Sequence, residues 1–115
     1  MPVENTLISY TKAEKKYVDS RDGYSIVLPK DTDELRRYGK AFHNCVAIYC
    51  NSVVEKRTLI LAMKRGKKFI ACLEVRQNRL VQALGPCNQK LPMTVGEVLC
   101  RWADDKKIAY KMRRK

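Results

Sequence analysis

The sequence offers little material for metal, disulfide or nucleotide-loop chemistry. It has one histidine, and no Gly-x-Gly-x-x-Gly motif is present, which argues against a phosphate-binding loop of that kind. Its five cysteines are odd in number and show neither Cys-x-x-Cys nor paired Cys/His spacing, so neither a zinc site nor a disulfide framework is indicated. We therefore expect no metal, no cofactor and reduced thiols in a cytoplasmic protein. The cysteines are Cys45, Cys50, Cys72, Cys87 and Cys100.

Long apolar runs are also missing. No stretch approaches the length of a transmembrane helix, and the residues after Met1 lack the basic and apolar regions of a secretion signal. We expect a protein without a membrane partner and without such a signal. With 115 residues, of which 45% are hydrophobic, the chain is long enough for one core but too short for two independent domains.

Acidic residues are scarce relative to basic ones. Asp and Glu number 12 against 24 Lys and Arg, which gives a net charge of +12 and a pI near 9.7. This surplus is enough to attract a polyanion through counterion release, and the alternative is a highly soluble basic protein without such a partner. The charge is spread along the chain, which suits contacts with a phosphate backbone better than base recognition. The expected partner is a nucleic acid of either type, or a complex that contains one, and the oligomeric state stays open. The candidate contacts are Lys15, Lys16, Arg36, Arg37, Lys64, Arg65, Lys67, Lys68 and the tail 111–115.

Two capping patterns predict helices in the first third of the chain. Thr11-Lys-Ala-Glu14 has the form of a capping box that begins a short basic helix ending near residue 18. Asp31 followed by acidic residues predicts the start of a second helix. Between the two, Asp22-Gly23 indicates a turn, and residues 24–28 form a β-branched and aromatic run that predicts a strand.

Gly39 leaves two alternatives for the helix that begins after Asp31. Either it continues through the glycine to about residue 54, or it ends with Gly39 at its C′ position and a new helix begins with Asn44 as N-cap. In the continuous helix, His43 and Cys45 point about 200° apart and cannot face each other. In the broken version, which the glycine and N-cap patterns favour, Cys45 lies in the first turn of a helix, where free N–H groups and the helix dipole lower a thiol's pKa.

The second half of the chain predicts a β-meander followed by a helix. Residues 58–63, 69–76 and 80–84 are strand-like runs, separated by polar turns at Arg65-Gly66 and at residues 77–79. A three-residue second loop puts Glu74 opposite Gln82 on one face of the sheet. After a turn-rich connection, Thr94 is expected to cap a helix from residue 95 to about 108, whose apolar stripe covers a sheet face.

Together these elements predict an α+β fold. The expected architecture is a small, mainly antiparallel sheet of three or four strands, packed by a central helix and a C-terminal helix. The predicted organisation along the chain is an N-terminal basic helical extension over residues 1–23, a single α+β domain over residues 24–110 and a basic tail over residues 111–115.

Three short motifs in this order resemble the PcfJ-like family, whose members are associated with conjugative plasmids and other mobile elements. The motifs are an Asn-Cys-Val-x-x-Tyr helix start, a Leu-Glu-Val strand end and a Gln-x-x-Gly-x-x-Asn arrangement. The resemblance spans residues 24–105 and implies a mobile-element or phage setting, but it brings no established reaction. The matching positions are Asn44, Cys45, Val46 and Tyr49, then Leu73, Glu74 and Val75, then Gln82, Gly85 and Asn88.

Cys45 and His43 form the first candidate for catalysis. Cys45 as a nucleophile needs a lowered pKa and a base, and a helix start together with His43 supplies both if the backbone breaks before Asn44. The alternative for Cys45 is a buried structural thiol, which is the commoner role of a free cysteine. The alternatives for His43 are a helix cap or a solvent-exposed side chain.

Glu74 and Gln82 form the second candidate. Polar side chains that point from central strands toward a helix need polar partners, and Asn44, Tyr49 and Asn88 are available for that role. The resulting pocket would use Glu74 as an acid or base and the amides to orient a substrate. The alternative places Glu74 on the solvent face of the sheet, paired with a lysine.

These patterns support three hypotheses for function. The first is a basic nucleic-acid-associated module of a mobile genetic element, which contacts the phosphate backbone and predicts steep salt dependence with little sequence preference. The second is an enzyme whose site gathers five side chains with His43 nearby, namely Cys45, Tyr49, Glu74, Gln82 and Asn88. The third is a small phage-type inhibitor of a host complex that handles nucleic acid.

Overall fold

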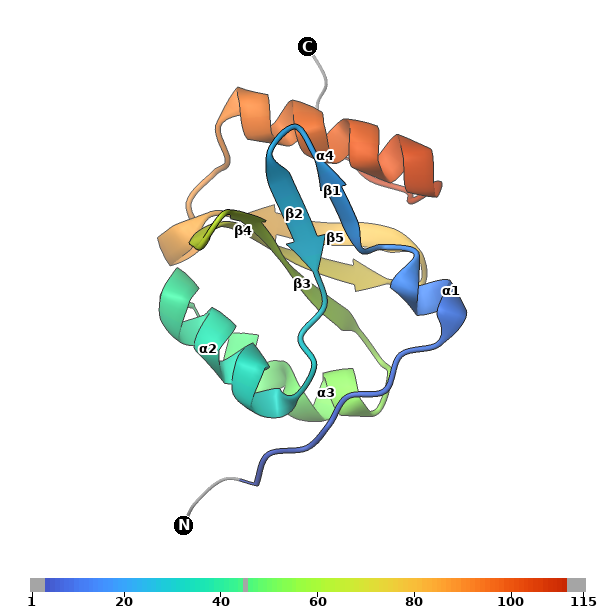
Figure 1. Cartoon of the computed structure of the whole chain (residues 1–115), viewed down its shortest axis with the longest axis vertical. Helices are drawn as coiled ribbons and strands as arrows, with labels where there is room; N and C mark the ends of the chain where they lie inside the picture. The colour runs from blue at the N-terminus through green and yellow to red at the C-terminus, as the bar shows by residue number, and fades with distance from the viewer. Residues whose placement is uncertain (1–3, 45, 112–115) are drawn as a thin grey trace.

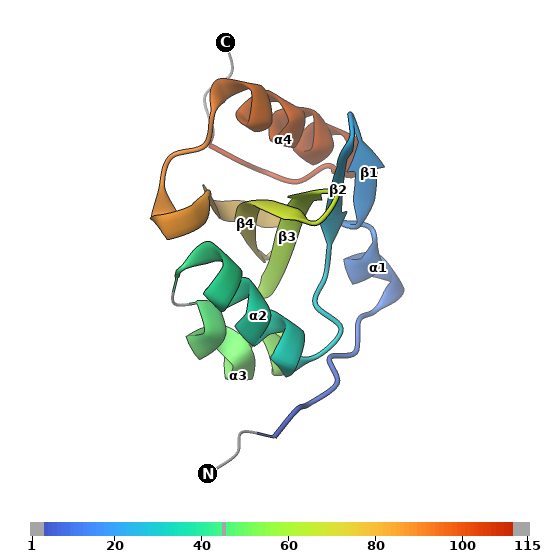
Figure 2. The same ribbon diagram turned by 60° about the vertical axis from the view of Figure 1, so that its left-hand side comes forward.

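A five-stranded antiparallel sheet runs through the middle of the molecule, between two layers of helices (Figure 1). The computed structural model describes residues 4–44 and 46–111. The strands lie in chain order, and α2 and α3 cover one face of the sheet while α4 covers the other (Figure 2). The strands are β1 (Asp19–Arg21), β2 (Tyr24–Val27), β3 (Leu59–Arg65), β4 (Lys68–Arg76) and β5 (Arg79–Leu84). The helices are α1 (Lys12–Lys15), α2 (Thr32–Phe42), α3 (Cys50–Val54) and α4 (Met93–Lys106), with two 3-10 turns, η1 (Val46–Tyr49) and η2 (Pro86–Asn88).

The α+β class and the antiparallel meander are confirmed, but the sheet has five strands where three or four were predicted. The unpredicted strand is β1, whose Asp-Ser-Arg sequence has no β-branched or aromatic residue and so gives no strand pattern of its own. It forms because Asp22 and Gly23 both take positive φ angles (52° and 83°), which makes a tight turn that folds β1 back onto β2. Pairing, rather than intrinsic propensity, makes this segment a strand.

The central strand β3 is buried on both of its faces. Leu61 and Met63 point toward α4 and share a core with Trp102, whereas Ile60 and Ala62 point toward α2 and share the other core. Burial on both sides explains why β3 reads as a continuous apolar run rather than as an alternating one. In the described part of the chain, no helix has both the length and the apolar character that crossing a membrane requires.

The helix that begins after Asp31 breaks at neither predicted position. α2 continues through Gly39 and ends at Phe42, so the expected end at Gly39 is wrong and so is the continuous helix to residue 54. The apolar stripe of α2 extends past the glycine to Phe42, whose full burial outweighs the cost of about 1 kcal/mol for a glycine within a helix. His43 then takes the left-handed conformation, and the Asn44 side chain accepts a hydrogen bond from the Val46 N–H at 3.0 Å. This bond spans two residues, as in an Asx turn. The residue directly before η1 is Cys45, which lies outside the described residues, so Asn44 as an N-cap stays a prediction.

The predicted pairing of Glu74 with Gln82 is confirmed, although the loop beside it is shorter than expected. The turn contains two residues, Gln77 and Asn78, which both have positive φ angles (50° and 60°). A two-residue turn alone would place Val81 opposite Glu74. A β-bulge inserts Val81 as an extra residue in β5 and shifts the register by one, which brings Gln82 to that position.

Two further boundaries differ from the prediction by one or two residues. The β3–β4 turn lies at residues 66–67, because Gly66 takes the positive φ angle (59°) that the first position of this turn requires. α4 begins at Met93, with Pro92 as its N-cap residue and Thr94 in its first turn, so Thr94 does not cap it. The Pro92 carbonyl accepts the N–H of Gly96 at 3.0 Å and thereby sets this earlier start.

Residues 4–23 pack against the rest of the domain. Thr11 and Glu14 form the predicted capping box, in which each backbone N–H donates to the other residue's side chain. The helix that follows has only four residues, because the chain then turns into β1. Ile8 is buried in the core beneath α2, and Tyr17 is buried in the core beneath α4.

Trp102 joins the last helix to the N-terminal segment, and we expect its replacement by phenylalanine to destabilise the fold. The indole is fully buried, and its Nε1–H donates to the Tyr17 carbonyl oxygen at 2.8 Å. Trp102→Phe leaves that carbonyl without its donor and the core with a smaller side chain, so the free energy of unfolding should fall by about 2 kcal/mol. Urea unfolding followed by circular dichroism measures the change. The control is Met93→Ala on the exposed start of the same helix, which should stay within about 0.5 kcal/mol of wild type. A loss as small as the control's would show that the contact contributes little.

Candidate functional site

A cavity of about 130 Å³ opens between the α2 layer and strands β4 and β5. Its walls come from the chain after α2, from both strands and from η2, and Val46 and Leu84 supply apolar surface. Every residue of the predicted polar pocket except Cys45, which lies outside the described residues, lines this one cavity. The structure thus brings together side chains that are far apart in the sequence. The polar lining residues are Asn44, Tyr49, Cys72, Glu74, Gln82 and Asn88.

Glu74 is the most buried of these polar side chains, with 5% of its surface exposed. The Thr58 hydroxyl donates to its Oε2 at 2.7 Å, and the Arg76 Nε–H donates to the same oxygen at 2.9 Å. Within residues 4–44 and 46–111, no hydrogen bond reaches Oε1. One carboxylate oxygen is therefore anchored by the protein, while the other remains available as an acceptor. The alternative placement of Glu74 on a solvent face is wrong: it points into the cavity, and its ion pair is with Arg76 rather than with a lysine.

Gln82 and Asn88 form the open side of the cavity. Gln82 lies opposite Glu74 on the edge strand β5, and Asn88 ends η2 with a positive φ angle of 58°. Both side chains are exposed, and neither amide has a hydrogen-bond partner among the described residues. Each amide carries one acceptor oxygen and two donor hydrogens, so the mouth of the cavity presents donors and acceptors side by side.

Cys72 contributes a thiol of low reactivity to the cavity. Burial raises the pKa of Cys72 to about 11, a hydrogen bond from the Asn44 side chain opposes part of this rise, and the nearby Glu74 charge adds to it. Burial also raises the pKa of Cys50, whose Sγ lies 4.0 Å from the Thr32 carbonyl oxygen. Because the thiolate is the nucleophilic form, neither side chain is suited to attack at neutral pH.

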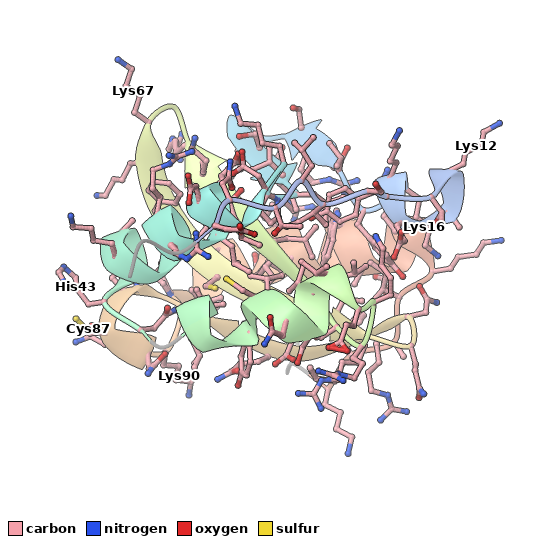
Figure 3. The ribbon with its side chains drawn as sticks, turned by 90° about the horizontal axis from the view of Figure 1, so that it is seen from below. Lys12, Lys16, His43, Lys67, Cys87 and Lys90 are labelled. Atoms are coloured by element: carbon pink, nitrogen blue, oxygen red, sulfur yellow. The ribbon has the colours of Figure 1, made fainter. Side chains whose placement is uncertain are left out.

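The predicted pair of His43 and Cys45 is only half described. Cys45 lies outside the described residues, so its predicted role as a nucleophile stays a prediction. His43 is exposed, takes the left-handed conformation that ends α2, and does not line the cavity. Seen from the α2 side, it lies at the surface of the end of the molecule that also carries Cys87 and Lys90 (Figure 3).

The model of the PcfJ-like protein family matches residues 3–98. The chain belongs to the PcfJ-like family. This confirms the resemblance that the three motifs indicated, and the matched range contains all five strands and every polar residue of the cavity. Comparisons with curated proteins and with solved structures find no match.

Several predicted phosphate contacts of this PcfJ-like protein are engaged within the molecule. Arg36 donates from Nη1 to Asp33 Oδ1 at 2.6 Å. Arg65 donates from Nη1 to the Tyr24 hydroxyl at 3.1 Å and lies over the same ring. The Lys64 ammonium lies 5.1 Å from the centroid of a phenylalanine ring. These cations have a structural role and are only partly available to a ligand.

The other predicted contacts within the described residues are exposed and form no ion pair there, and residues 112–115 of the predicted basic tail lie outside the described residues. The exposed contacts do not make one basic face, because Lys67 lies at one end of the molecule whereas Lys12 and Lys16 lie at the other (Figure 3). The hairpin end therefore has to be considered separately from the α1 end. These exposed contacts are Lys15, Lys16, Arg37, Lys67 and Lys68, of which Lys16 also lies 5.2 Å from the centroid of the Tyr17 ring.

Sequence reasoning missed three residues that matter for the site. Lys90 follows Asn88 by two positions and lies at the same end as His43 and Lys67 (Figure 3). It was overlooked because a single lysine in a turn-rich segment gives no pattern. Thr58 was taken only as the first residue of a strand, and its hydroxyl contact with Glu74 depends on the register of β3 against β4. Arg76 was given no role, although its spacing of two from Glu74 along one strand is the pattern that places both side chains on one face.

We expect the cysteines to differ in their rates of alkylation. Since the raised pKa leaves little thiolate at about pH 8, Cys72 should react with iodoacetamide far more slowly than the exposed Cys87. Its rate should go on rising as the pH approaches 11. Mass spectrometry of peptides from a timed reaction measures each rate, and unfolding in urea provides the control in which the rates converge. Equal rates for Cys72 and Cys87 in the folded protein would contradict the burial of Cys72.

Proposed function

We propose that this chain is a nucleic-acid-binding module of a mobile genetic element, which holds the phosphate backbone through exposed lysines. The observation that carries the proposal is the unpaired positive charge at the hairpin end. Lys67 and Lys68 lie at the tip of the β3–β4 hairpin, and Lys90, two residues after Asn88, lies at the same end of the molecule as Lys67 (Figure 3). None of the three forms an ion pair within the described ranges. Cations that no carboxylate neutralises are available to phosphates.

The proposal is also supported by which basic residues form ion pairs within the protein and which do not. The ion pairs of the described residues are made mostly by arginines, such as Arg21 with Asp105 and Arg101 with Asp22, and Lys56 is the one lysine among them. The planar guanidinium matches a carboxylate, whereas the lysine ammonium is a point charge on a flexible stem. The surplus charge is therefore presented largely by lysines, which suit contacts that do not depend on sequence.

Membership in the PcfJ-like family supports a plasmid or phage setting for this function. The partner would be a nucleic acid, or a complex that contains one. The four described cysteines are free thiols, which fits a reducing cytoplasm.

The proposal predicts steep salt dependence of binding. For labelled single-stranded and double-stranded DNA and RNA, we expect the logarithm of the affinity to fall linearly with the logarithm of the salt concentration. Lys67→Gln/Lys68→Gln removes two phosphate contacts, so the magnitude of the slope should fall by about two. Fluorescence anisotropy over a series of salt concentrations measures both quantities.

Arg57→Gln/Arg101→Gln is the matched control, because it removes the same charge from side chains that are already paired with carboxylates. Its slope should stay close to that of wild type. Equal losses in the two double variants would argue against contacts at the hairpin end. Weak binding without salt dependence would leave the charge as a solubility feature.

That result would favour a second candidate function, an enzyme whose site is the cavity. The burial of Glu74 among amide side chains supports this alternative.

A further inference from the structure

The cavity has the size of one six-membered ring. Its volume of about 130 Å³ is close to the volume of about 150 Å³ at which a protein cavity holds benzene. It is open on one side, so that a group attached to the ring can remain in solvent. Apolar atoms of Val46 and Leu84 and the ring of Tyr49 line it, which are the surfaces that a flat ring contacts with its faces.

The polar groups of the cavity select what this ring must carry. Glu74 Oε2 is occupied by Thr58 and Arg76, whereas Oε1 has no donor among the described residues. A bound ring therefore has to present an N–H to Oε1, and a carbonyl at that place would be repelled. The exocyclic amino group of cytosine is the donor that carboxylates accept in base recognition. Uracil and thymine present a carbonyl at the same ring position.

The amides at the mouth supply the complementary donors. Beside its amino group, cytosine has two acceptors, a ring nitrogen and a carbonyl oxygen. Gln82 lies directly across the strand pair from Glu74, and Asn88, from η2, lines the same cavity. Their free N–H groups can satisfy both acceptors, because each amide has two donor hydrogens. Lys90 is exposed, follows Asn88 by two residues and lies at the same end of the molecule as Cys87 (Figure 3), so we take it as the contact for the phosphate of a nucleotide whose base has entered the cavity.

We propose that this cavity binds a single unpaired cytosine, with Glu74 accepting from the exocyclic amino group and Gln82 and Asn88 donating to the ring nitrogen and the carbonyl oxygen on the same edge of the base. The inference rests on the proposed nucleic-acid function and adds the selective part of the ligand. The base has to be unpaired, because in a duplex its amino group and both acceptors are engaged by guanine. DNA and RNA share this chemistry.

A first experiment tests the cavity without any phosphate. The side-chain amide signals of Gln82 and Asn88 are followed by NMR while cytidine or uridine is added. Cytidine should shift both signals saturably, with an affinity about tenfold higher than that of uridine. Absence of a response to cytidine, or equal affinities for the two nucleosides, overturns the proposal.

A second experiment tests whether a variant reverses the preference between cytidine and uridine, a result that misfolding would not produce. Glu74→Gln keeps an oxygen for Thr58 and Arg76 but replaces the free oxygen with an N–H₂ donor. The preference for cytidine over uridine should therefore be lost and turn toward uridine. Glu97→Gln, the same change on α4 at the opposite face of the sheet, should keep the wild-type preference. An unchanged preference in Glu74→Gln overturns the proposal.

Gln82 provides an independent variant on the edge strand. Gln82→Ala should weaken cytidine binding about tenfold. Its matched control is Gln89→Ala, an exposed glutamine that does not line the cavity, which should bind cytidine as wild type does. Equal behaviour of the two variants counts against the proposed contact.

Single-stranded oligonucleotides separate this inference from the proposed function. A thymidine oligomer is compared with the same oligomer carrying one central dC or one abasic site, and a uridine series with one cytidine identifies the RNA source. We expect about tenfold tighter binding with the single cytosine. Salt-dependent binding that ignores the cytosine overturns the pocket proposal and leaves backbone binding intact. Oligonucleotide binding without salt dependence, together with cytidine binding in the cavity, overturns the backbone proposal and leaves the pocket intact.

Discussion

The two hydrogen bonds that hold Glu74 determine what the site can do. A carboxylate with only 5% of its surface exposed is costly in the interior unless donors replace the water it has lost. Thr58, just before β3, and Arg76, on β4 itself, supply those donors, and both reach the same oxygen. The carboxylate is thereby fixed on a rigid strand with its second oxygen open to the cavity. Polar groups held in this way bind ligands more selectively than groups on a loop do.

The position of Gln82 depends on one extra residue in the edge strand. A shift of one residue in a strand moves every side chain to the other face of the sheet. With the two-residue turn at Gln77 and Asn78 but without the bulge at Val81, Gln82 would point toward α4 and the cavity would lose an amide. Bulges occur next to functional sites because they re-aim side chains. The short turn and the bulge together have the same effect on register as the three-residue loop that the sequence suggested.

The sequence predicted elements well where local chemistry determines them. The Thr11 and Glu14 capping box and the pairing of Glu74 with Gln82 both depend on contacts between residues close in the chain or in one hairpin. The elements it missed depend on packing. β1 exists because it pairs with β2, and α2 continues through Gly39 because Phe42 is buried against the sheet. Neither the strand pairing nor the burial of Phe42 leaves a recognisable pattern in the neighbouring residues of the sequence.

In the candidate site, too, the features set by local contacts were predictable from the sequence and those set by packing were not. Which strand residues share a face follows from a period of two, so the convergence of Glu74 and Gln82 was predictable from the sequence. How α2 and η2 close over that face was not, because it requires the packing of segments that are more than 40 residues apart. For the same reason the sequence could not separate Lys67, at the hairpin end, from Lys16 at the opposite end (Figure 3). From the sequence alone, both lysines belonged to one set of candidate phosphate contacts spread along the chain.

Affinity and selectivity are carried by different parts of the proposed complex. Lysines at the surface interact with phosphates through water, so salt screens them strongly, whereas Glu74 inside the cavity is screened much less. Raising the salt concentration would therefore weaken binding to every strand but leave the ratio between cytosine and thymine nearly unchanged. A protein built this way associates rapidly with any strand through its lysines. It stays longest where an unpaired base meets the acceptor that Thr58 and Arg76 leave free.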